Sequence, residues 1–355
     1  MPRRRFLKRL LAMTYFSLLS ASMLLGKKHE NHCHCEPVRT LAWQSVTPIN
    51  DNLAQPLQRG AFCAAFFLFH FPAKIVENPL SFCYHERKYN LKQKQVICME
   101  KAIMLTSGEL TIPVKANESD FGVQRLVLTV HGLGGSSEDD IQASIAEEME
   151  FFGSAVYRFD FPTHGESPLE SKFFTLKNCQ ESLMAVARYA RECYPEVEDL
   201  CIFATGFGAY VVLTCLEDMM DLPGKLKLVL QTPSVRMHET LLTMKGISRA
   251  TLEAMGYMSF TRRRHLDVTF DFYQELENNM VMMTYPLPML ILHGEEDSVI
   301  RHEDIENFVR INDQSKLVII PGASHRFQEP GAWDMVLDLT RDWFEFEQVL
   351  LSDWS

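Results

Sequence analysis

From residue 101 onward, short apolar runs alternate with longer segments of helical periodicity, and this alternation is the strongest constraint on the fold. The run Arg125–Val130 (RLVLTV) is unbroken, which is typical of a strand buried on both faces of a parallel sheet. After a hairpin of 101–106 and 109–114, the pattern predicts a doubly wound, mostly parallel α/β sheet. Further strands are predicted at 155–159, 200–204, 226–230, 289–292 and 317–320, and helices at 138–150, 176–193, from 208, 303–311 and 333–346.

The charge changes sign near residue 98, which divides the chain in two. Residues 1–98 hold 14 Lys and Arg against 5 Asp and Glu, whereas residues 99–355 hold 21 against 41. We therefore separate a basic leader, 1–98, from an acidic α/β domain, 99–355. The overall net charge of −11 argues against non-specific nucleic-acid binding. We expect no nucleic-acid partner.

The leader begins like a targeting segment. Five basic residues precede the uncharged run Leu10–Leu25, which has signal-peptide length and is slightly short for a membrane span. Arg3–Lys8 also resembles a twin-arginine export motif, but no small-x-small cleavage site follows. One interpretation is export or membrane anchoring through residues 1–25. The interpretation we favour is that 1–98 is upstream translation absent from the native protein, which would start at Met99 and be cytoplasmic. A small domain without a readable pattern is a third alternative.

The sequence offers little support for a disulfide framework, a metal site or a cofactor. Its nine cysteines include no C-x-x-C pair. The run His29–Cys35 contains metal-ligating side chains without the paired spacing of zinc modules. Neither a Walker loop nor a G-x-G-x-x-G motif occurs. We therefore expect no metal and no cofactor.

Four motif-bearing loops each follow a predicted strand. Ligands of doubly wound sheets bind beyond the carboxyl ends of the strands, which is where these loops lie. Any one loop is weak evidence, but four in this order predict a functional site at that edge. They are His131–Gly135 (HGLGG), Asp160–Ser167 (DFPTHGES), His293–Ile300 (HGEEDSVI) and Pro321–Phe327 (PGASHRF).

With these motifs, residues 101–348 resemble the α/β-hydrolase superfamily. The resemblance is to its esterase and serine-aminopeptidase-like branch, which includes bacterial cinnamoyl (feruloyl) esterases. It implies an α/β-hydrolase fold with an inserted helical lid at about 235–286. It also implies that Asp297 is the catalytic acid and His325 the base. The backbone N–H groups of Leu133 and Phe207 would form the oxyanion hole.

The sequence departs from this family at the nucleophile. The family motif G-x-S-x-G corresponds here to Ala204–Gly208 (ATGFG), and Gly206 occupies the position of the serine. Glycine has no side chain to attack a carbonyl, but it meets a positive φ without strain. Thr205, Ser234 and Ser324 are nearby hydroxyls, and we disfavour each as a substitute. We expect His131 to be structural.

Two features of the predicted lid have competing interpretations. Its methionines could line a pocket for acyl or aromatic groups, although ordinary packing is favoured. The run Arg262–Arg264 could bind a carboxylate, although a solvated charge run is favoured. Seven of the 18 methionines fall here: Met237, Met244, Met255, Met258, Met280, Met282 and Met283.

Two functions from different classes remain open. By resemblance the chain is a hydrolase of carboxylic esters or small amides, impaired or inactive as written because Gly206 occupies the nucleophile position. The alternative is a non-catalytic pseudo-hydrolase that binds a small molecule. Either function implies a small ester or amide ligand with an apolar or aromatic acyl group. A membrane is a partner only if residues 1–25 act as an anchor.

Overall fold

The computed structural model describes residues 100–120 and 122–347. The signal-like segment 1–25, the run His29–Cys35 and the rest of the leader lie outside the described residues. The domain boundary at residues 98 and 99 therefore stays a prediction.

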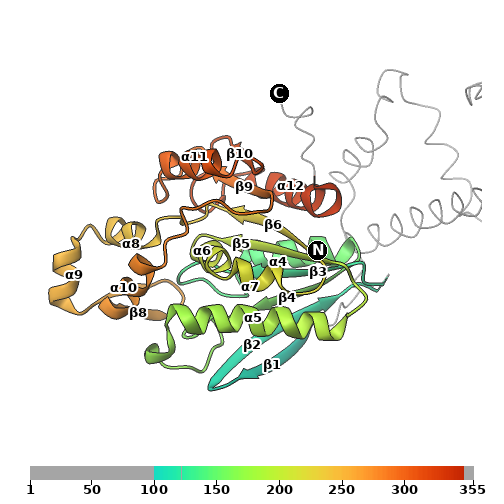
Figure 1. Ribbon diagram of the computed structural model, residues 1–355, viewed down its shortest axis with the longest axis horizontal. Helices are drawn as coiled ribbons and strands as arrows, with labels where there is room; N and C mark the ends of the chain where they lie inside the picture. Colours follow the sequence, from blue (N-terminus) through green and yellow to red (C-terminus); the bar gives the residue numbers. More distant parts are fainter. Residues whose placement is uncertain (1–99, 121, 348–355) are drawn as a thin grey trace, which may run out of the picture. The chain divides into compact units, whose positions relative to one another are not determined.

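The centre of the domain is an eight-stranded sheet in the order β1-β2-β4-β3-β5-β6-β9-β10 (Figure 1). Strands β1 and β2 form a hairpin, and β2 also pairs antiparallel with β4. The remaining pairings, from β4 across to β10, are parallel, which confirms the predicted doubly wound, mostly parallel sheet. The strands are β1 Lys101–Ser107, β2 Leu110–Glu118, β3 Arg125–Val130, β4 Ser154–Phe159, β5 Asp199–Thr205, β6 Lys225–Gln231, β9 Met289–Gly294 and β10 Lys316–Ile320.

Helices cover both faces of this sheet because successive strand residues point to opposite sides. Along β5, Leu200 and Ile202 pack with residues of α5 and α6, whereas Cys201 and Phe203 pack with residues of α4 and α12. The predicted helices are all present, within a few residues of the expected bounds. They are α4 Asp140–Phe151, α5 Leu176–Cys193, α6 Phe207–Thr214, α7 Leu216–Met220, α11 His302–Ile311 and α12 Ala332–Phe346, with a short 3₁₀ helix, η3, at Ser171–Phe173.

The insertion between β6 and β9 contains three helices and also a β-hairpin that the sequence did not predict. Its helices are α8 Met237–Lys245, α9 Arg249–Met255 and α10 Phe270–Asn278, which lie together beside the sheet in Figure 1. Between α9 and α10, β7 Tyr257–Thr261 and β8 His265–Thr269 form a separate antiparallel hairpin. The hairpin forms because Met258, Leu266 and Val268 recur with a period of two and bury one face.

The seven methionines of the insertion differ in burial. Met237 and Met258 are buried in the core and Met282 is partly buried against it, as ordinary packing requires. The other four are exposed, with 48% to 62% of their surface accessible: Met244, Met255, Met280 and Met283.

Two further properties concern only residues 100–120 and 122–347. No helix in these ranges is long and apolar enough to cross a membrane. The four cysteines there are free thiols, three of them buried and Cys193 exposed.

Candidate active site

The turn between β5 and α6 has the backbone conformation of a nucleophile elbow. Gly206, at its apex, has φ 50° and ψ −111°. Its N–H donates to the carbonyl of Gln231 at 3.0 Å, and its own carbonyl accepts from the N–H of Ser234 at 3.2 Å. This conformation is strained for residues with a side chain, whereas glycine adopts it readily.

The two glycines of the turn are required for different reasons. A Cβ on Gly208 would lie 2.5 Å from the carbonyl oxygen of His131 and 2.7 Å from that of Val130. A Cβ on Gly206 would meet nothing within 4 Å. Gly208 therefore lets α6 approach the end of β3, while Gly206 is constrained only by its φ and faces open space.

The loops after β9 and β10 bring Asp297 and His325 together. His325 Nδ1 lies 2.9 Å from Asp297 Oδ2, and Asp297 Oδ1 accepts from the N–H groups of Val299 and Ile300 at 2.8 and 3.0 Å. The Asp297 side chain is fully buried, whereas the His325 side chain is 29% exposed. Although burial acts to raise the pKa of Asp297, the hydrogen bond and charge of His325 and the two N–H groups outweigh it and lower that pKa. An ionised Asp297 favours the tautomer of neutral His325 that carries its proton on Nδ1, because only that tautomer donates to the carboxylate.

His293 is a neighbour of this pair that the sequence did not single out. It is the penultimate residue of β9 and is fully buried, with Nδ1 3.8 Å from Asp297 Oδ2. Burial lowers its pKa to about 4, so the ring is neutral at pH 7. The available signal was its position four residues before the acid, at the end of a buried strand.

His131 holds the loop after β3, in agreement with the structural role expected for it. Its ring is buried, with Nδ1 2.8 Å from the carbonyl of Gly132, while Nε2 accepts from the N–H of Phe161 at 3.1 Å. Burial lowers the pKa of His131 to about 4. Leu133, two residues further on, is partly buried against the core. The ring thus joins this loop to the one after β4.

Asp160 makes a second connection between the same two loops. Its carboxylate accepts from the N–H of Ser137 at 2.6 Å and from that of Glu166 at 2.8 Å. A Cβ on Gly165 would lie 2.3 Å from the Asp160 carboxylate, so the loop passes close to that group. The loops after β3 and β4 therefore act as one unit.

An aromatic cluster lies beside the elbow. The side chain of Phe207 is buried, with its ring centroid 5.8 Å from those of Phe161 and Phe174 and 6.0 Å from that of Phe272. Phe272 belongs to α10, so the insertion contributes to this buried cluster. The buried ring of His164 lies 5.0 Å from that of Phe174, and burial lowers its pKa to about 3.

The three alternative hydroxyls have partners elsewhere. Thr205 Oγ1 lies 3.5 Å from the carbonyl of Val130, toward β3. Ser234 donates to Thr240 Oγ1 at 3.1 Å, and Ser324 is hydrogen-bonded to Glu329.

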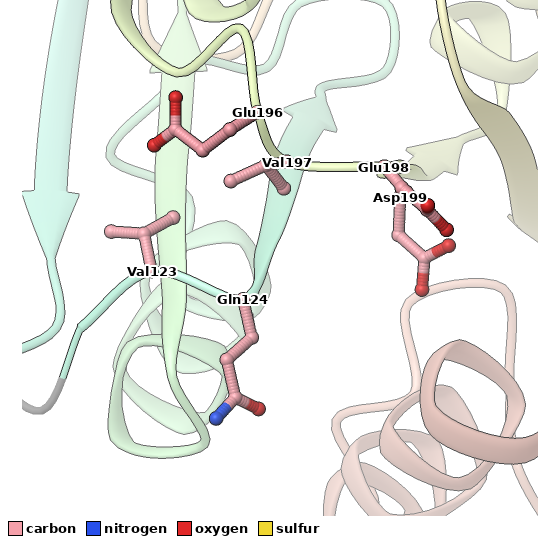
Figure 2. A pocket seen from close by; sticks show the side chains of 6 residues that line it. All are labelled: Val123, Gln124, Glu196, Val197, Glu198 and Asp199. Atoms are coloured by element: carbon pink, nitrogen blue, oxygen red, sulfur yellow. The ribbon is translucent and has the colours of Figure 1, made fainter.

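An open hollow of about 410 Å³ lies at the opposite edge of the sheet (Figure 2). It is lined by Val123 and Gln124, before β3, and by Glu196–Asp199, leading into β5. Both segments enter the amino ends of parallel strands, away from the elbow and from the Asp297–His325 pair. Within the ranges that the structure describes, no group of three or more His, Cys, Asp or Glu side chains is arranged to hold a metal ion.

Comparison with solved structures identifies the architecture. Est1E from Butyrivibrio proteoclasticus, solved with ferulic acid, is 21% identical and has a TM-score of 0.61 over 70% of this chain and 99% of its own. A putative hydrolase from Agrobacterium vitis is 18% identical, with a TM-score of 0.59 over 68% and 97% of the two chains. Mouse alpha/beta hydrolase domain-containing protein 10 is 14% identical, with a TM-score of 0.58 over 70% and 100%. The chain has the α/β-hydrolase fold. No family model and no curated protein matches it in sequence.

Proposed function

We propose that the described domain carries the active site of an ester hydrolase in which a glycine, Gly206, occupies the position of the nucleophile. It would bind small carbonyl compounds at the elbow and hydrolyse them slowly or not at all. The observation that carries this proposal is Gly206, which has the backbone of an elbow apex, φ 50° and ψ −111°, with open space where a side chain would project.

In the proposed mechanism Asp297 orients His325, and His325 acts as the general base. The N–H of Phe207 belongs to the first turn of α6, where helical N–H groups have no partner within the helix. Together with the N–H of Leu133 it would hold the developing oxyanion. Without a serine, His325 would have to activate water directly, and no covalent acyl intermediate would form.

The ligand class is proposed from the apolar surroundings of the elbow. The rings of Phe161, Phe174 and Phe272 pack around Phe207 and are themselves buried in the core. An apolar or aromatic acyl group suits such surroundings better than a charged one. Est1E, which shares the fold, was solved with ferulic acid, an aromatic acid of this kind. We propose small esters or amides of such acids as ligands.

A second candidate is a pseudo-hydrolase that only binds its ligand. The specific observation in its favour is that glycine at position 206 removes the strain of the elbow together with the nucleophile. The compartment of either function depends on the leader. It would be cytoplasmic if translation starts at Met99, and exported or membrane-anchored if residues 1–25 act as a signal.

Gly206→Ser tests the vacant elbow. The natural chain and the variant are compared on p-nitrophenyl acetate, p-nitrophenyl butyrate and a feruloyl ester, and both are treated with a fluorophosphonate. Because loss of a catalytic serine removes most of the rate, we expect the variant to gain at least about 10³-fold in kcat/KM and to be labelled covalently.

Two double variants are the controls. Adding His325→Ala should abolish the gain, and adding Asp297→Asn should reduce it strongly because the base loses its orienting partner. A folded Gly206→Ser protein that neither turns over nor labels would contradict the proposal. Ligand binding by the natural chain without turnover would select the pseudo-hydrolase.

A further inference from the structure

The turn of the β7–β8 hairpin consists of three consecutive arginines, Arg262, Arg263 and Arg264. The hairpin is anchored by its buried side chains, Met258 from β7 and Val268 from β8, which face each other across the strands. The arginine tip therefore projects from a fixed base. Its guanidinium groups contact the loops at the carboxyl edge of the main sheet, although the run stays solvated, with the Arg262 and Arg263 side chains 35% and 45% exposed.

Two of these arginines bind the same carboxylate. Arg262 Nη1 lies 3.1 Å from Asp139 Oδ2, and Arg263 Nε lies 3.1 Å from Asp139 Oδ1. The Asp139 side chain is only 9% exposed. A carboxylate this buried depends on its cationic partners, because a buried charge without one is strongly destabilising.

Arg262 and Asp139 also pack against the backbone of the loop after β3. A Cβ on Gly134 would be 3.5 Å from Arg262 Cβ. A Cβ on Gly135 would be 2.5 Å from Asp139 Oδ2 and 3.4 Å from Arg262 Nη1. The ion pair thus lies on the two residues that follow Leu133.

The third arginine binds the neighbouring loop. Arg264 Nη1 donates to the carbonyls of Gly165 and Ser167 at 3.1 and 2.6 Å. This loop is joined to the loop after β3 through the ring of His131 and the carboxylate of Asp160. The arginine tip therefore contacts both the loop after β3 and the loop after β4, which are joined to each other.

We propose that Arg262 is a positioning residue: through Asp139 and its packing on Gly134, it fixes the backbone that presents the Leu133 N–H. The inference rests on the proposed function only for the use made of that N–H. The structural part of the inference, that the insertion orders the loop after β3, does not depend on any catalytic activity. The insertion is then a support for the loop that follows β3.

The first experiment uses the natural full-length chain and needs no activity. Arg262→Met keeps an unbranched side chain of similar length and removes the charge. Arg262→Lys restores a charge at the same site. Arg249→Met is the matched control, since Arg249 pairs with Glu253 and Glu277 inside the insertion. Amide hydrogen exchange is measured for residues 132–135 and for strands β5 and β6.

In Arg262→Met we expect the Gly135 amide, which donates to the Gly132 carbonyl at 3.0 Å, to exchange at least about 10-fold faster, with β5 and β6 unchanged, because local opening is confined to the released loop. Arg262→Lys should recover most of the protection, and Arg249→Met should leave the loop as it was. Unchanged exchange at Gly135, or an equal rise throughout the sheet, would overturn the proposal. If Arg262→Met does not fold, Arg262→Met with Asp139→Asn removes both charges and gives the same test.

The second experiment places the same changes on Gly206→Ser. Displacing an oxyanion donor should lower kcat by about 10- to 100-fold with KM nearly constant, and lysine should restore much of it. A rise in KM at constant kcat would overturn the positioning role and make Arg262 a ligand-binding residue. If Gly206→Ser itself is inactive, the proposed function fails, and the exchange measurements alone decide the positioning role.

Discussion

The turn after β5 and the paired loops after β9 and β10 lie at the same edge of the sheet but differ in what they present. The turn at Gly206 has a backbone supported by hydrogen bonds to Gln231 and Ser234 and no reactive side chain. The loops present two ionisable side chains, because His325 lies within hydrogen-bonding distance of the buried Asp297.

The difference teaches that backbone geometry and side-chain chemistry are maintained by separate interactions. The elbow is held by main-chain bonds and by the tight approach of Gly208 to β3, neither of which involves the apex side chain. The Asp297–His325 pair is held by the side chains themselves. The turn therefore does not depend on the side chain at its apex, whereas loss of Asp297 would release its own loop.

The largest expected effect on stability separates the two glycines of the turn. Gly208→Ala should cost about 3 kcal/mol or more, because its Cβ would lie 2.5 and 2.7 Å from backbone oxygens that cannot move independently. Gly206→Ala should cost about 1–3 kcal/mol from its positive φ alone. Urea unfolding of both variants measures the difference. Equal costs would mean that the approach of α6 to β3 is not the constraint we describe.

The next effect concerns the trade between activity and stability at the apex. Gly206→Ser should unfold about 1–3 kcal/mol more easily than the natural chain, because serine must adopt φ 50°. Its melting temperature should fall while its esterase rate rises. A variant that gains activity at unchanged melting temperature would show that the turn relaxes when it receives a side chain.

A third prediction concerns how the stability of the protein depends on pH through two buried histidines, one after β3 and one in β9. His131 and His293 have pKa values lowered to about 4 by burial, against about 6.5 in the unfolded chain. The unfolded state therefore binds more protons between these values. The contribution of these two histidines to the free energy of unfolding is therefore fully present above pH 6.5 and is lost as the pH falls toward 4.

One pKa unit at one site is about 1.4 kcal/mol, so we expect at least that loss between pH 7 and pH 4. Thermal unfolding across this range, with imidazole NMR titrations, is the measurement. Rings of His131 and His293 that titrate near pH 6.5 in the folded protein would contradict it.

The smallest expected effect is that of removing the leader. If the boundary predicted at residues 98 and 99 is right, residues 99–355 should be soluble and melt cooperatively. The melting temperature should match that of the full chain, because the described core lies within 110–344. Insoluble or non-cooperative 99–355 would mean that the leader contributes to the fold.

Much of the architecture could be predicted because its signals are local. The buried run Arg125–Val130 and the helix Leu176–Cys193 have the bounds expected from their patterns, since strand and helix periods are properties of short segments. The β7–β8 hairpin was missed. Its buried residues Met258, Leu266 and Val268 alternate over only five residues a strand, within a segment otherwise helical.

The sequence by itself determined the sheet, the order of the motif loops and the absence of a side chain at Gly206. Only the tertiary structure decided which groups meet. Asp297 and His325 are 28 positions apart in the sequence, and Asp139 and Arg262 are 123 apart, so neither pair carries a local signal of contact. Such pairs form because parallel strands deliver distant loops to one edge, where a buried carboxylate requires whichever cation or N–H the fold places beside it.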